Sequence, residues 1–428
     1  MTPVEVKLWG TTIGALSQEG DDFASFEYNP DFVLSGIEPA PLTMPVRAGV
    51  IYRFPNLSPA TFHKLPGLFA DSIPDKFGNK IIDQWLVQNG RNPGSFSALE
   101  RLCYTGSRGT GALEFYPAIG PDFKESEPLE IEQLRTLAAN ILDQRKKVKV
   151  RLQEKEAFEQ IVKVGTSAGG ARAKVLIAYN ETTNTVLSGQ VPAPKGFGYW
   201  LLKFDDIENN RDKENADPAG FGALEYTYSE IAKKAGIQMT DCRLLTDGNH
   251  RHFMTRRFDR TENGKKLHYQ SLAAIAHYDF NIAGAYSYEQ AFAVARRIGL
   301  TTADIEQMYR RAVFNICARN QDDHTKNIGF LMDKRGKWSL APAFDITYAY
   351  NPSGHWTSSH QMTFNGKREN FTLDDFKSVA KNAGLVQGRY KRILEQVQDS
   401  LAEFKKFAKA NNVPAKLARE VEKNLVWV

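Results

Sequence analysis

The sequence predicts an α+β fold of two or three lobes that share buried cores. Between Val4 and about Leu34, apolar and polar residues alternate and glycines recur, a pattern typical of small antiparallel hairpins. In the second half of the chain, apolar residues recur instead at helical spacing. The length of 428 residues is sufficient for several packed lobes.

Composition is that of an ordinary globular protein, with 42% apolar and 25% charged residues. No run approaches the roughly 20 apolar residues that cross a bilayer, and the start, MTPVEVKLWG, lacks the features of a secretion signal. We therefore expect a cytoplasmic protein with no membrane partner. The net charge of +5 permits an anionic partner without requiring nucleic acid. Three widely separated cysteines predict buried thiols, not disulfides or a zinc site.

Proline content and charge density divide the first half of the chain into regions. Residues 39–66 are too rich in proline for long helices, and a helix is expected from about Phe77. Charge density then rises over residues 127–160, where Arg145-Lys-Lys-Val-Lys indicates an exposed helix end or a linker. We place a domain boundary near this point.

The clearest element of the second half is a helix. Thr301 and Asp304 have the spacing of a capping box. One apolar face follows, formed by Ile305, Met308, Tyr309, Ala312, Val313 and Ile316. The polar cluster Asn320-Gln-Asp-Asp-His-Thr-Lys-Asn327 comes next and leads into an apolar strand. A polar loop between two rigid elements is a usual place for functional groups.

Asp322 and Asn327 have the D-x-x-x-x-N spacing of a protein-kinase catalytic loop, although the spacing alone would also suit a solvated turn. The residues that follow favour the kinase interpretation. Expected strands at 328–332 and 337–341 flank a turn, so the chain returns and brings Asp345 beside the loop. In a kinase the first Asp accepts the proton of the attacking hydroxyl, while the Asn and the second Asp ligate magnesium.

Two upstream segments offer the other parts that a kinase requires. Small residues in Gly165-Thr-Ser-Ala-Gly-Gly-Ala-Arg-Ala-Lys174 would let backbone amides approach phosphates, although a flexible hairpin has the same pattern. Lys203 lies within an apolar strand, where it could bind phosphates or snorkel from an edge. A helix expected at 223–235 carries Glu225, a candidate ion-pair partner of Lys203. The order of these parts predicts a protein-kinase-like two-lobed fold.

Longer stretches resemble the HipA family, the kinase components of bacterial toxin-antitoxin pairs. The resemblance covers nearly all 428 residues and is carried by Leu68-Phe-Ala-Asp-Ser-Ile-Pro-Asp, Gly106-Ser-Arg-Gly-Thr-Gly-Ala-Leu-Glu-Phe, Arg257-Phe-Asp-Arg, Asn320 to Asn327 and Ala341 to Asp345. It implies an additional amino-terminal β-rich subdomain and a mainly helical carboxy-terminal lobe. We expect a HipA-type amino-terminal domain at 1–150, a nucleotide-binding kinase lobe at 151–270 and a helical catalytic lobe at 271–428.

The resemblance also implies roles for single residues. Asp322 looks like the general base, Asn327 and Asp345 look like the magnesium ligands, and Lys203 looks like the phosphate-binding lysine. Ser167 lies where the family autophosphorylates a serine, and Thr166 is the adjacent acceptor. The implied contacts with ATP are Gly169, Gly170, Ala171, Arg172, Ala173, Lys174, Lys203, Arg256, Arg257, Phe258, His324, Asn327, Phe344 and Asp345.

By this resemblance the chain is expected to be an ATP- and magnesium-dependent serine/threonine protein kinase. The implied substrate is an aminoacyl-tRNA synthetase, and the implied outcome is growth arrest. The implied partner is a small HipB-like helix-turn-helix antitoxin that binds operator DNA, so the kinase itself would meet that DNA only indirectly. Phosphate on Ser167 is expected to lower ATP affinity.

Two other classes of function stay open at this point. Asp322, Asp323, His324 and Asp345 could form the site of a metal-dependent phosphohydrolase, which would leave Lys203 without a role. Alternatively, the chain could be a non-catalytic scaffold that binds an antitoxin or DNA, but the complete set of kinase residues argues against this. Two further histidines, His250 and His252, are expected at the surface.

Overall fold

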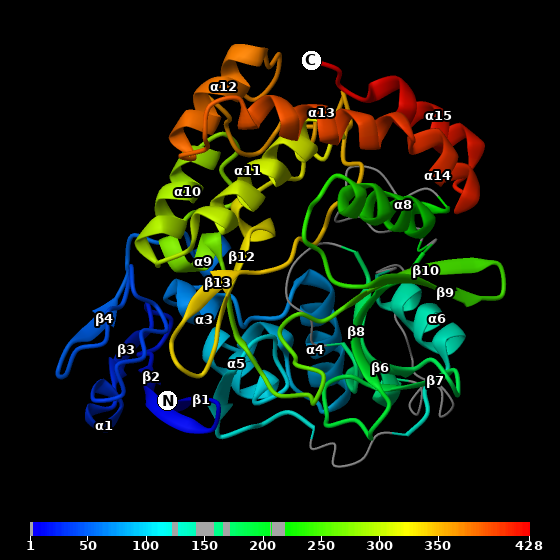
Figure 1. The fold of residues 1–428 in the computed structure, drawn as a ribbon. Helices are drawn as coiled ribbons and strands as arrows, with labels where there is room; N and C mark the ends of the chain where they lie inside the picture. Colours follow the sequence, from blue (N-terminus) through cyan, green and yellow to red (C-terminus); the bar gives the residue numbers. More distant parts are fainter. Residues whose placement is uncertain (1–2, 122–126, 143–157, 166–171, 206, 208–218) are drawn as a thin grey trace.

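The structure is a computed structural model that describes residues 3–121, 127–142, 158–165, 172–205, 207 and 219–428. Its amino-terminal part is an antiparallel sheet of five strands in the order β4-β3-β2-β1-β5 (Figure 1). The strands are β1 (Val4–Leu8), β2 (Thr11–Ser17), β3 (Ser25–Tyr28), β4 (Ile51–Arg53) and β5 (Leu113–Tyr116). Side chains along β1 alternate between buried and half-buried, which confirms the predicted hairpins.

The first 142 residues contain both short and longer helices. The first three have four residues each, α1 (Pro30–Val33), α2 (Pro59–Phe62) and α3 (Gly67–Ala70). Of these, α2 lies within residues 39–66, where the density of proline predicts no long helix. The others are α4 (Lys76–Gln88), the 3₁₀ turn η1 (Pro93–Ser95), α5 (Ala98–Thr105) and α6 (Ile131–Leu142). Helix α4 begins at Asp75, whose carboxylate accepts a hydrogen bond of 2.7 Å from the Gly78 N–H.

The second sheet also has five strands, in the order β7-β6-β8-β10-β9. They are β6 (Lys174–Asn180), β7 (Thr185–Ser188), β8 (Gly198–Lys203), β9 (Cys242–Asp247) and β10 (His250–Arg256). Lys174 and Lys203 are cross-strand partners, so two lysines lie side by side on one face at the end of this sheet. Helix α8 (Phe221–Lys234) contacts β9 and β10.

The last part is mainly helical and surrounds a small third sheet, β11 (His268–Ser271), β12 (Gly329–Met332) and β13 (Trp338–Leu340). Its helices are α9 (Leu272–Ala276), α10 (Tyr288–Arg297), α11 (Thr302–Cys317), the 3₁₀ turn η2 (Thr325–Asn327), α12 (Leu373–Asn382), α13 (Arg389–Ala402), α14 (Phe404–Ala410) and α15 (Ala415–Asn424). The predicted capping box of α11 is present, with Asp304 N–H donating to Thr301 Oγ1 at 3.2 Å. The strands predicted on either side of the turn form the hairpin β12–β13.

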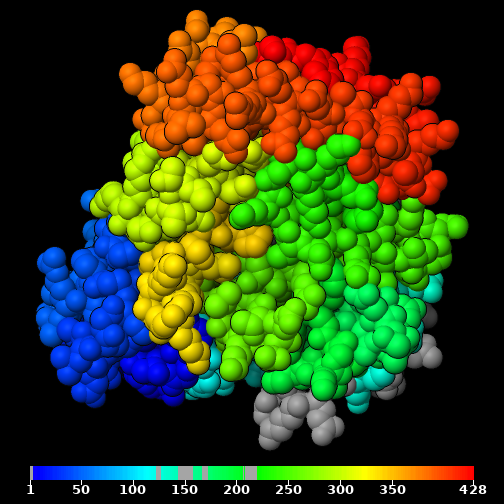
Figure 2. All heavy atoms as spheres, in the orientation of Figure 1, coloured from blue at the N-terminus to red at the C-terminus, as the bar shows by residue number. Residues whose placement is uncertain are grey.

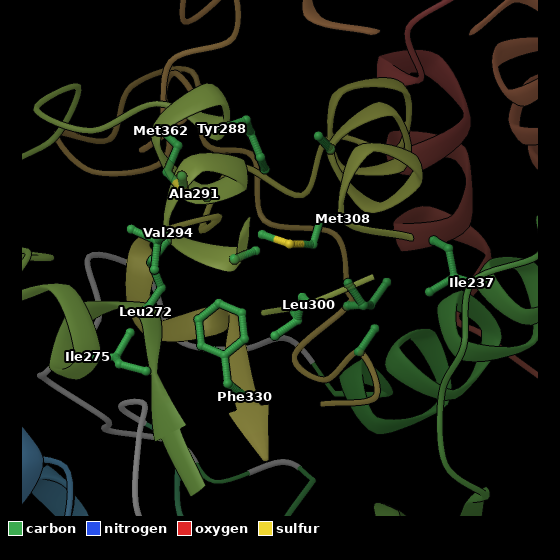
Figure 3. Packing of buried hydrophobic residues seen from close by; sticks show 14 of the residues in the cluster. Ile237, Leu272, Ile275, Tyr288, Ala291, Val294, Leu300, Met308, Phe330 and Met362 are labelled. Atoms are coloured by element: carbon green, nitrogen blue, oxygen red, sulfur yellow. The ribbon is translucent and has the colours of Figure 1, made fainter. Parts of the chain in front are cut away.

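Two hydrophobic cores hold these parts together. The smaller core joins α4 and α6 to the second sheet and contains Ile81 and Trp200. The larger core joins the amino-terminal sheet to the helical part, where Phe330 of β12 lies among residues such as Leu272 and Met308 (Figure 3). Because the amino-terminal part contributes to both cores, it supports the second sheet and the helical part at the same time.

The amino-terminal part and the helical part also meet at the surface, where the β12–β13 hairpin lies against amino-terminal residues (Figure 2). There Trp338 Nε1 donates to the Glu38 carbonyl oxygen at 3.3 Å.

All three cysteines are buried, as predicted. The surface position expected for His252 is wrong, because β10 is an inner strand and His252 is 0% exposed, its Nδ1 accepting a hydrogen bond from the Asp205 N–H at 3.0 Å. Within the described ranges, no helix combines the length and apolarity needed to span a membrane.

Candidate active site

The polar segment 320–327, here named the catalytic loop, is held by backbone and side-chain hydrogen bonds. Its Asn327 amide nitrogen donates to the Asp322 carbonyl oxygen at 2.8 Å. This bond closes the loop on itself and turns the Asn327 amide oxygen away from Asp322. At the other end of the loop, Gln321 N–H donates to the Ala349 carbonyl oxygen at 3.1 Å, so the loop pairs with the segment that follows Asp345.

The Asp322 side chain lies at the exposed side of the loop and is 44% exposed. Its Oδ1 accepts a hydrogen bond of 2.6 Å from the indole nitrogen of Trp356. His324 Nε2 lies 3.7 Å from the same oxygen. The other carboxylate oxygen has no donor among the described residues, so it is available to an incoming hydroxyl.

Asp345 follows the hairpin and reaches the loop from the other side. Its φ of +53° places it in the left-handed region, and its carbonyl oxygen accepts a 3.4 Å hydrogen bond from Asn320. Its Oδ1 accepts a hydrogen bond from Lys203 Nζ. Burial alone would raise the pKa of the Asp345 carboxyl, but the positive charges of Lys203 and Lys174, with the hydrogen bond from Lys203, together outweigh burial and hold that pKa well below its usual range. Asp345 is therefore an anion beside the catalytic loop.

Lys203 is buried and makes ion pairs with two carboxylates. Besides Asp345, it contacts Glu225 of α8, with 2.5 Å between Nζ and Oε1. Burial opposes its charge, but the attraction of Asp345 and Glu225 prevails and the pKa of Lys203 is raised. The second oxygen of Glu225 accepts from Arg172 Nη1 at 2.7 Å. Lys203 is thus a fixed cation, and the snorkelling interpretation does not describe it.

Lys174, the cross-strand neighbour of Lys203, has a different partner. Its ammonium lies 3.4 Å from Asp75 Oδ2, and both side chains are at most 3% exposed. Burial raises the pKa of Asp75, and the positive charge of Lys174 opposes that rise. A carboxylate of the amino-terminal part therefore pairs with the second lysine of the site.

The donor types present are those that magnesium and the phosphates of ATP require. Mg²⁺ takes one or two protein oxygen ligands together with phosphate oxygens and water, and Asn327 and Asp345 offer an amide oxygen and a carboxylate beside one loop. Lys203 and Lys174 supply fixed positive charge on the adjacent sheet. These are the parts that neutralise charge in phosphoryl transfer.

Three of the residues expected to contact ATP, Arg256, Arg257 and Phe258, lie at the end of β10 and directly after it. Phe258 packs against Tyr269 and Phe344, with ring centroids 5.7 and 5.5 Å away. Arg257 is buried and makes two hydrogen bonds to Asp259, at 2.9 and 2.8 Å, so its side chain has a structural partner. Arg256 is near Asp241, at 3.9 Å. The aromatic group brings the predicted residues Phe258 and Phe344 together.

Comparison with known proteins decides the family. Residues 166–404 match the HipA-like C-terminal domain, and residues 4–116 match the HipA N-terminal domain. The chain belongs to the HipA family. A solved HipA chain from Shewanella oneidensis MR-1, in complex with HipB and its operator DNA, covers 98% of this chain and 96% of its own length, with a TM-score of 0.68 and 16% identity. That likeness confirms the predicted protein-kinase-like α+β fold.

Two curated proteins of Sinorhizobium fredii are similar in sequence and are named as kinases. The one called "Putative kinase Y4mE" is 23% identical over 94% of this chain and 91% of its own length. The one called "Putative kinase Y4dM" is 24% identical over 54% of this chain, and the match spans 58% of that relative. With HipA family membership, these names support a HipA-type kinase or toxin.

Part of the predicted phosphate loop lies outside the described residues, namely Thr166, Ser167, Gly169, Gly170 and Ala171. Of its described members, Ala173 is buried and its carbonyl oxygen accepts from the Phe204 N–H at 3.1 Å. Arg172 reaches Glu225, as described above. The Gly165 end of the loop packs tightly, since a Cβ there would lie 2.1 Å from Ile81 of α4.

Three positions of the site escaped the sequence interpretation. Asp75 gave a signal, because it precedes a helix as an N-cap, but nothing local indicated Lys174 as its partner. Trp356 gave none, since it follows Asp322 by 34 positions. Asp323 was considered only as a metal ligand; it is instead buried and accepts hydrogen bonds from Tyr288 Oη at 2.7 Å and from the Gln361 N–H at 2.7 Å. This arrangement removes one carboxylate from the phosphohydrolase interpretation.

Proposed function

We propose that the chain is an ATP- and magnesium-dependent protein kinase that transfers phosphate to serine or threonine. The observation that carries the proposal is the pairing of buried Lys203 with both Glu225 and Asp345, beside a loop in which Asn327 is bonded to the backbone of Asp322. This is the set of parts used by protein kinases. A structural ion pair alone would not require the polar loop.

In this proposal each side chain has a separate task. Lys203 binds α- and β-phosphates as a charge-assisted donor, and Glu225 fixes its orientation. Asn327 and Asp345 hold magnesium, which neutralises the charge of the phosphates when it is bound. Asp322 orients the attacking hydroxyl and accepts its proton. Positioning and electrostatics, rather than covalent chemistry by the protein, lower the barrier.

We further propose the biological setting from the family. The substrate would be an aminoacyl-tRNA synthetase, and the partner would be a HipB-like antitoxin, as the HipA–HipB–operator complex of Shewanella oneidensis indicates for that protein. The division at 1–150, 151–270 and 271–428 and the cytoplasmic location also belong to this proposal. Autophosphorylation of Ser167 would switch off ATP binding by placing a second anionic group in the phosphate loop.

The test uses purified full-length chain, γ-labelled ATP and magnesium, with label counted in the chain itself and in added synthetases. Wild-type protein should incorporate label, and Asp345→Asn should not. Asp399→Asn, a change at an exposed position of α13, should leave incorporation unchanged. Equal labelling of the wild-type and Asp345→Asn proteins, with circular dichroism showing both folded, would exclude this site as the kinase centre.

A further inference from the structure

We infer that Trp356 is a positioning residue of the phosphoryl-transfer site, which fixes the orientation of the Asp322 carboxylate from a segment 34 positions later in the chain. The inference rests on the proposed kinase function and deepens it. Asp322 is the more exposed of the two loop aspartates, at 44%, and a side chain in such a position would rotate freely without an anchor. The indole N–H supplies that anchor.

The hydrogen bond from Trp356 occupies one oxygen of the Asp322 carboxylate and leaves the other oxygen available to a substrate hydroxyl. Trp356 Nε1 lies 2.6 Å from Asp322 Oδ1, and His324 Nε2 lies 3.7 Å from the same oxygen. Trp356 is therefore the hydrogen-bond donor to Oδ1, and no described residue donates to Oδ2. A hydroxyl that approaches Oδ2 meets a carboxylate plane already set by a hydrogen bond to a rigid ring.

Trp356 is itself held in place. It belongs to residues 351–361, here named the Trp356 segment, in which the Asn351 N–H donates to the Thr357 carbonyl oxygen at 3.2 Å. Gln361 Nε2 donates to the Trp356 carbonyl oxygen, and the Gln361 N–H donates to buried Asp323. The segment is thus tied to the residue next to Asp322, so the indole and the carboxylate share one support.

Aromatic rings pack around the hydrogen bond between Trp356 and Asp322. His324 lies 6.2 Å from the Trp356 ring and 5.4 Å from the Phe280 ring, measured between centroids. Lys326 Nζ lies 5.2 Å from the centre of the Phe280 ring. The indole therefore has a packed environment on its loop side, which restricts the rotation of its donor.

By orienting Asp322, the Trp356 indole would act in the transfer of the γ-phosphate to a substrate hydroxyl. The acceptor oxygen forms a bond to the γ-phosphorus, the bond from that phosphorus to the bridging oxygen breaks, and ADP leaves with those electrons. The hydroxyl proton passes to Asp322 Oδ2. A donor on Oδ1 also withdraws charge from the carboxylate, which opposes proton acceptance. Because the transition state is loose and little proton transfer has occurred in it, orientation outweighs this loss of basicity.

The kinetic test compares two changes that each remove one indole N–H. Trp356→Phe should lower kcat for label transfer by about 10- to 100-fold, the effect of losing a hydrogen bond to a charged group, with KM for ATP within about twofold. Trp338→Phe removes the indole that donates to the Glu38 carbonyl and should leave kcat unchanged. A wild-type kcat for Trp356→Phe, or a matching rise in KM for ATP, overturns the inference.

A spectroscopic arm tests the contact without relying on transfer. The chain has six tryptophans, so an ¹⁵N-indole spectrum has six resonances, and Trp356→Phe assigns one of them. That resonance should move upfield in Asp322→Ala and stay in place in Asp399→Ala. If it does not respond to Asp322→Ala, Trp356 does not bind the carboxylate and the inference fails. If the wild-type chain transfers no phosphate but the resonance responds, the kinase proposal fails while the contact stands.

Discussion

The two faces of the catalytic loop carry adjacent aspartates in opposite environments. The Asp322 side chain is 44% exposed and has one close donor, the Trp356 indole. The Asp323 side chain is 1% exposed and accepts from Tyr288, from the Gln361 N–H and from His360 Nδ1, which lies 2.9 Å away. Burial would raise the pKa of Asp323, but the His360 contact and these hydrogen bonds lower it.

The difference shows how one residue type is divided between structure and chemistry. A carboxylate with all its oxygens occupied by donors has no capacity left for a substrate proton, whereas it is well suited to tie segments together. Asp323 ties the loop to α10 through Tyr288 and to the Trp356 segment through Gln361. Asp322 is left with one oxygen available. The buried face thus supports the geometry that the exposed face uses.

The largest expected effect separates the two faces by activity. Asp322→Ala should reduce label transfer from ATP by about 10²- to 10⁴-fold, because it removes the group that orients the hydroxyl and accepts its proton. Its free energy of unfolding should stay within about 0.5 kcal/mol of wild type, since the removed side chain lies at the surface. Denaturant titration and single-turnover transfer measure both quantities on the same preparation. Full transfer by folded Asp322→Ala protein would end the assignment of Asp322 as the base.

The opposite change should act on stability first. Asp323→Ala leaves Tyr288 and His360 without their buried partner, and breaking such a buried ionic group costs about 3 to 5 kcal/mol. Urea titration should show this loss, with Asp399→Ala as the exposed control. Should Asp323→Ala retain wild-type stability and lose only transfer, Asp323 and not Asp322 would be the reacting carboxylate.

The sequence was informative where a signal is local. Thr301 and Asp304 predicted the start of α11, and the alternation along 4–34 predicted the first hairpins, because capping and periodicity depend on neighbours in the chain. The order of Lys203, Glu225, Asp322, Asn327 and Asp345 also placed the parts of the site in one group. The D-x-x-x-x-N spacing selected Asp322, but the sequence could not show that Asp323 is buried, since the partners that set the two environments lie 34 to 38 positions away.

Contacts between distant segments were the other part that the sequence left out. The Asp75–Lys174 pair forms because α4 packs on the second sheet, and no periodicity reports such packing. His252 was misplaced for a related reason, since nothing local in the sequence shows that sheet order makes β10 an inner strand. The fold was predictable as a class, whereas the partners of Asp75 and His252 required tertiary structure.

The stability of the fold should depend on pH through the buried Asp323. Because the folded pKa of Asp323 is lowered, its charge stabilises the fold above its unfolded pKa of about 3.9, and this contribution is lost as pH falls through the folded value. The difference in unfolding free energy between the wild-type and Asp323→Asn proteins should therefore shrink as pH falls below about 4. Chemical denaturation at several pH values measures it. A difference that grows on acidification would contradict the ionised state of Asp323.

The smallest expected effect tests whether the two faces are separable. Tyr288 Oη donates to Asp323 at 2.7 Å and accepts from Asn315 at 3.0 Å, while its ring packs 6.1 Å from Phe364. Tyr288→Phe keeps the ring and removes these two hydrogen bonds, so it should cost about 1 to 2 kcal/mol of stability. Tyr390→Phe, a change in a partly buried ring of α13, should cost less than about 0.5 kcal/mol.

Transfer activity gives the decisive reading of the same variant. Since Asp323 keeps the Gln361 N–H and His360, the Trp356 segment should stay attached and kcat should remain within about threefold of wild type. Single-turnover transfer well below the unfolding midpoint would show this. If Tyr288→Phe lowers kcat as strongly as Trp356→Phe, the loss of a hydrogen bond to Asp323 also disturbs the orientation of Asp322. The two aspartates would then act as one unit, and the contrast between a supporting and a reacting carboxylate would no longer hold.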